Sequence, residues 1–183
     1  MNGPQAAATP RRVLFWAVSW LVSALREGAI RSWLFATGFA AMVPVHALAR
    51  DQVVDGRIAT IAVVFLVGSL PGLLTAWLIV ALLGSRGNWS ARFSLALIAI
   101  MVCVPLATAF IFFLQYRIYF SAWHDPAFTE VWIWQILFTG ATAVYLFVVS
   151  AIPFILPLGL LLIVAAAWSF ARPWSAGHPV MGG

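Results

Sequence analysis

The sequence predicts an all-α, polytopic transmembrane helical bundle. Of its 183 residues, 64% are hydrophobic and only 8% are charged, whereas soluble domains carry about 25% charged residues. The apolar residues are gathered in runs close to the ~20 residues that a helix needs to span a bilayer. Because lipid offers the backbone no hydrogen bonds, such runs must be helical. We expect five spans, with four as the alternative, preceded by an interfacial amphipathic helix.

The N-terminal part predicts a disordered segment and then the interfacial helix. Residues 1–10 show no apolar periodicity. In residues 11–30 the apolar run ends after 13 residues, at Leu25, which is too short to span. The polar residues of this stretch share one helical face, as a helix in the headgroup layer requires: Arg12, Ser19, Ser23 and Arg26. A signal peptide cleaved near residues 22–24 is the alternative, although cleavage would leave Arg31 outside, against the positive-inside rule.

Three spans are expected next, at about residues 32–49, 58–84 and 93–114. Each has arginines at both ends and an apolar interior near the length that a bilayer requires. These spans account for most of the uninterrupted apolar sequence before residue 115. The polar stretch that follows predicts a loop on the outer side of the membrane.

The last apolar region, residues 131–171, contains no charged residue. As one helix it would be about 60 Å long, twice the ~30 Å of hydrocarbon. Pro153 and Pro157 each disfavour a continuous helix. A hairpin there would give spans at 131–152 and 155–171 and would place Trp132 and Trp168 in one interface, where Trp is enriched. Four crossings remain the alternative, because they leave Arg172 inside. The tail, residues 173–183, is expected to be disordered.

The arginines indicate where the protein resides. All ten basic residues are Arg, and this bias, with the frequent Ala, suggests a bacterial source. The arginines stand at the ends of the spans and are more numerous on the side that carries the N-terminus, which predicts the inner membrane with a cytoplasmic N-terminus. They form no patch, so we expect no nucleic-acid partner. The expected partners are the lipid bilayer and other membrane proteins, or a second copy.

Four residues are candidates for a functional site on the outer side: His46, His124, Asp125 and Glu130. With Asp51 and Asp55 nearby they could form a metal site, and His46, inside a span, could serve a haem if a second histidine lay at the same depth. No metal-binding spacing such as HExxH is present. Asp125-Pro126 also fits a helix start. We therefore predict a solvated loop, with no catalytic residue, metal or cofactor.

Two patterns inside the spans predict helix contacts. Gly68 and Gly72 form a GxxxG pair around Pro71, which suits close helix packing; the alternative is a broken helix that lines a transport site. A second pattern gives the span at 131–152 a mild polar face: Gln135, Thr139, Thr142 and Ser150. Hydrogen bonding to a neighbouring helix is the favoured interpretation of that face.

These features favour a non-enzymatic accessory or assembly subunit that binds other membrane helices. A small transporter or channel component is the first alternative, because of the proline and glycines in the second span. A metal- or haem-dependent membrane enzyme is the second alternative, because of His46 and the outer acidic residues.

Overall fold

The computed structural model describes residues 10–50, 56–84, 87–120 and 125–172, without the side chains of residues 10–17, 21, 153–155 and 157. Every regular element in these ranges is helical: α1 (Pro10–Ala49), α2 (Gly56–Leu83), α3 (Trp89–Tyr119), α4 (Glu130–Phe154), the π-helical turn η3 (Ile155–Gly159) and α5 (Leu160–Ala171). The first four helices are long and apolar enough to cross a membrane, and α5 is a shorter apolar helix. The prediction of an all-α chain is confirmed for the described residues, which include helices of the length and apolar composition that a membrane span requires.

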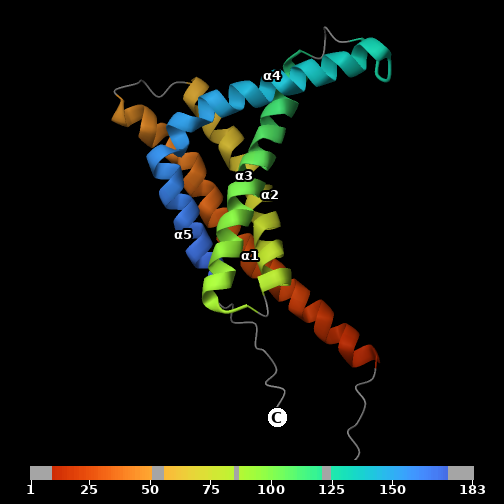
Figure 1. Ribbon diagram of the computed structural model, residues 1–183, viewed down its shortest axis with the longest axis vertical. Coiled ribbons are helices and arrows are strands. Elements are labelled where there is room, and N and C mark those ends of the chain that lie inside the picture. The colour runs from red at the N-terminus through yellow and green to blue at the C-terminus, as the bar shows by residue number, and fades with distance from the viewer. Residues whose placement is uncertain (1–9, 51–55, 85–86, 121–124, 173–183) are drawn as a thin grey trace, which may run out of the picture.

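Helix α1 is one continuous rod of 40 residues. It includes both the stretch predicted to be an interfacial helix, residues 11–30, and the first predicted span, residues 32–49. No helix breaker separates the two, and Gly28 lies buried inside the helix. Its first turns project beyond the other helices at the lower end of the bundle (Figure 1). A separate amphipathic helix at the N-terminus is therefore not confirmed.

Helices α1, α2, α3 and α5 form the bundle, while α4 lies across its upper end (Figure 1). Helix α2 packs against both α1 and α3, and α5 packs mainly against α3. The core between these helices is apolar and includes Phe39, Leu73, Ile100 and Phe170. Small, buried residues recur at every fourth position in the first part of α1: Ala24, Gly28, Ser32 and Ala36. Such a row lets neighbouring backbones approach closely.

The chain bends between α4 and α5 at Leu156, whose φ of −107° and ψ of 124° are not helical. Leu156 precedes Pro157, and a residue before proline is driven out of the helical region by the proline ring. Pro153, by contrast, lies within α4. Of the two prolines that were expected to interrupt the helix, only Pro157 does so.

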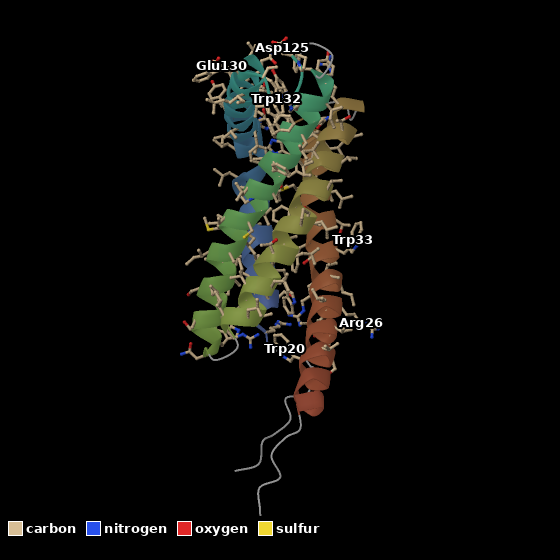
Figure 2. The ribbon with its side chains drawn as sticks, turned by 90° about the vertical axis from the view of Figure 1, so that its right-hand side faces the viewer. Trp20, Arg26, Trp33, Asp125, Glu130 and Trp132 are labelled. Carbon is tan, nitrogen blue, oxygen red and sulfur yellow. The ribbon has the colours of Figure 1, made fainter. Side chains whose placement is uncertain are left out.

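The bend does not produce the expected hairpin. Helices α4 and α5 make no contact with each other in the described part of the chain. The ring of Trp168 packs on Trp89, at the start of α3, with 5.0 Å between ring centroids. Trp132 instead lies at the upper end, beside Asp125 (Figure 2). The two tryptophans are thus at opposite ends of the bundle, because α4 runs across the end and only α5 runs along the bundle.

Candidate functional site

A charged cluster joins three helices near the lower end of the bundle. Arg31 of α1 forms an ion pair with Glu27, one turn earlier, and donates a hydrogen bond to the backbone carbonyl of Ser169 in α5. Its guanidinium carbon also lies 4.9 Å from the ring centroid of Trp77 in α2. The side chains of Arg31 and Glu27 are 18% and 26% exposed. The i, i+4 spacing of Glu27 and Arg31 is the sequence signal for this pair, whereas hydropathy alone marks Arg31 only as a charge beside a span.

Trp77 is the centre of this cluster and is only 2% exposed. Its indole nitrogen donates a hydrogen bond to the carbonyl of Ala24, at 2.9 Å. The ring meets Phe170 of α5 edge to face, with the centroids 5.2 Å apart. A buried Trp needs a partner for its N–H, and here the backbone of α1 supplies it.

Arginines from two helices interact with the C-terminal end of α5. Arg31 donates to the carbonyl of Ser169, and Arg92 of α3 reaches the carbonyl of Arg172 at 3.5 Å. The last carbonyls of a helix have no partner within the helix, and that end carries partial negative charge. These contacts place α5 against α1 and α3. We interpret the lower cluster as an anchor for α5, since Arg31 and Arg92 both donate hydrogen bonds to carbonyls at its C-terminal end.

The upper end holds α4 by a different contact. The guanidinium carbon of Arg117, in the last turn of α3, lies 5.2 Å from the ring centroid of Trp132 in α4. The hydroxyl of Thr129 accepts a hydrogen bond from the backbone N–H of Trp132, so Thr129 caps α4. The prediction that the helix starts at Asp125-Pro126 is wrong by one turn, because Thr129 provides the cap.

Helix α4 is the least buried of the long helices. Only 17% of the residues in its most apolar stretch are buried, against 50% in α2. Its C-terminal half is attached through Phe147, whose ring lies between those of Phe65 and Phe112. An exposed side of α4 is apolar along its whole length, and we call it the α4 face: Trp134, Phe138, Val148, Val149 and Ile152.

Two hollows adjoin α4. An open groove of about 710 Å³ lies between α3 and α4 and is lined almost entirely by apolar side chains. A smaller cavity of about 160 Å³ lies where α2, α3 and α4 meet. Its lining includes three polar residues, Thr60, Gln115 and Ser150. The polar residues of α4 therefore do not act as one set: Ser150 lines this cavity, while the side chain of Gln135 accepts a hydrogen bond from the backbone N–H of Asp125.

Among the predicted outer-side candidates that the structure describes, His46 lies apart from Asp125 and Glu130. His46 lies in the last turn of α1, and Glu130 is the first residue of α4; these helix ends lie on opposite sides of the upper end (Figure 1). Asp125 and Glu130 are both exposed beside the start of α4 (Figure 2). His124, Asp51 and Asp55 lie outside the described residues. Within the described ranges, no three His, Cys, Asp or Glu residues form a group that could hold a metal ion.

The glycines of α2 are in close contact with α3. A Cβ atom on Gly68 would lie 2.5 Å from the Cα of Thr108, and one on Gly72 would lie 2.7 Å from the Cα of Val104. Helix α2 continues through Pro71, which is exposed. Gly68 and Gly72 thus face a neighbouring backbone, which is what a packing role requires.

No family model matches this chain, and no curated protein or solved structure is significantly similar to it.

Proposed function

We propose that the protein is a multi-pass protein of the bacterial inner membrane that acts as a non-enzymatic accessory or assembly subunit. In this proposal it binds helices of other membrane proteins through the α4 face. The observation that carries the proposal is the position of α4, a 25-residue apolar helix that crosses the end of the bundle and is mostly uncovered by it. Trp134, Phe138 and Val149 are 53%, 67% and 52% exposed.

The arrangement of the helices supports four crossings, by α1, α2, α3 and the apolar segment formed by η3 and α5 together. The path from Glu130 to Arg172 begins at the upper end and finishes at the lower end, beside the start of α3. In this topology α4 lies along the outer boundary of the bilayer. Helices at such a boundary usually carry a strongly polar face, whereas the few polar residues of α4 are uncharged between Val131 and Phe154. A partner helix that covers part of α4 would shield its apolar side chains from the polar boundary of the bilayer.

The transporter alternative receives less support. It depended on a break in α2 that opens a substrate site, but α2 is continuous and its glycines contact α3. The cavity beside Thr60 is small, at about 160 Å³, compared with ~300–1,000 Å³ for typical ligand sites.

The proposal is tested by photo-crosslinking in native membranes. A photoreactive amino acid is placed at Phe138 on the α4 face, and in a control at Ile98, which is 63% exposed on α3. We expect an adduct of discrete mass from position 138 and none from position 98. A second copy of the chain gives an adduct of twice the mass, and another protein gives a different mass. Lipid adducts alone, or the same pattern at both positions, would refute the proposal.

A further inference from the structure

The groove between α3 and α4 follows a face of α3 that ends at a cation, Arg117. Leu106, Phe110 and Phe113 line it from α3, and Ile136, Ala141 and Val144 line it from α4. Arg117 continues the same face of α3, because positions 106, 110, 113 and 117 are three or four residues apart. Arg117 therefore lies one turn beyond Phe113, the last residue of α3 that lines the groove.

Arg117 retains hydrogen-bonding capacity. Its Nη1 atom is buried and donates to no described residue, while the guanidinium lies against the ring of Trp132. A partly desolvated cation without an anionic partner is unfavourable near a membrane. Arg31 is neutralised by the carboxylate of Glu27. No described carboxylate lies within salt-bridge distance of Arg117. Arg117 as a whole is only partly buried, so an anion from outside the chain would neutralise it at its accessible atoms.

We propose that this groove binds an anionic phospholipid, with an acyl chain between α3 and α4 and the phosphate at Arg117. Arginine matches phosphate through paired, charge-assisted hydrogen bonds, and basic pockets between membrane helices bind anionic lipid headgroups. A partner helix fits the groove less well. A helix is about 10 Å across, so 710 Å³ would hold fewer than about two of its turns, whereas a flexible chain can follow the groove.

The test compares lipids that differ only in the headgroup. The purified full-length protein is titrated with phosphatidylglycerol or phosphatidylethanolamine of identical acyl chains, and bound lipid is counted by native mass spectrometry. We expect one phosphatidylglycerol to bind more tightly than the others and more tightly than phosphatidylethanolamine. Arg117→Gln should weaken that site about fivefold or more, from the loss of one phosphate-facing arginine.

Arg172→Gln is the matched control, since Arg172 also lies over a tryptophan, Trp168, at 5.8 Å, but at the other end of the bundle. It should leave the tight site unchanged. Ala141→Trp fills the groove and should weaken both lipids while retaining Arg117. Circular dichroism verifies that each variant keeps its helix content. If Arg117→Gln and Arg172→Gln bind phosphatidylglycerol alike, or Ala141→Trp has no effect, the proposal is wrong. Cysteine crosslinking between copies at position 141 would also overturn it.

Discussion

The indole of Trp77 occupies the space that a side chain at position 28 would need. A Cβ atom on Gly28 would lie 2.1 Å from Cδ1 of Trp77. Trp77 is also fixed by its hydrogen bond to Ala24 and by the ring of Phe170, so it has little freedom to move. The contact between α1 and α2 therefore requires glycine at this position.

Gly28→Ala is expected to displace Trp77 and to lower the free energy of unfolding. Overpacking a tight interior costs about 1–3 kcal/mol, and loss of the Trp77 hydrogen bond adds to this. Steric-trapping measurements in micelles give the change. Gly140→Ala is the control, because the nearest atom to its new Cβ would be 3.7 Å away, on Phe113. Equal stability of the two variants would contradict the proposed role of Gly28.

Gly72→Ala is expected to push α2 and α3 apart. The added Cβ would meet backbone atoms, the carbonyl oxygen of Cys103 and the Cα of Val104, both at 2.7 Å, and backbone cannot rotate away as a side chain can. We expect a loss of at least about 1–3 kcal/mol, again measured by steric trapping. An unchanged free energy of unfolding would show that these helices do not pack this closely in solution.

Removing Arg31 is expected to cost more than removing its partner Glu27. Arg31→Gln loses the ion pair, the bond to the Ser169 carbonyl and the contact with Trp77, and leaves Glu27 partly buried without its cation. We expect about 1–3 kcal/mol, below the ~3–5 kcal/mol measured for fully buried pairs, because both side chains retain some exposure.

A double-mutant cycle with Glu27→Gln separates the pair from the other contacts. The double variant should recover part of the loss, since no uncompensated charge then remains. Arg26→Gln is the control, because Arg26 is exposed on the same helix, and it should have little effect. Equal effects at positions 26 and 31 would show that the lower cluster does not anchor α5.

The orientation of α5 predicts which positions share a side of the membrane. In a Cys103→Ala background, single cysteines replace the exposed residues Gly87, Asp125 and Arg172. A membrane-impermeant maleimide should label positions 87 and 172 from one side and position 125 from the other. Labelling of 125 and 172 from the same side would instead establish five crossings.

The hydropathy pattern of the sequence determined that this protein is helical and where its long apolar helices lie. Its prolines determined that the chain bends near Pro157. Those properties depend on neighbouring residues, so they can be predicted from short windows of sequence. The close packing at Gly68 and Gly72 is also predictable from the sequence, because a GxxxG pair forms a shallow groove into which the backbone of a neighbouring helix fits.

Only the tertiary structure decided where α4 and α5 go and which groups meet. Arg31 and Ser169 are 138 positions apart, and no local pattern connects them. An apolar helix surface looks the same in sequence whether it faces lipid, another helix or a groove, because lipid tails are as apolar as Leu. The choice depends on the fit of large side chains such as Trp77 against small ones such as Gly28, which exists only once the helices are assembled.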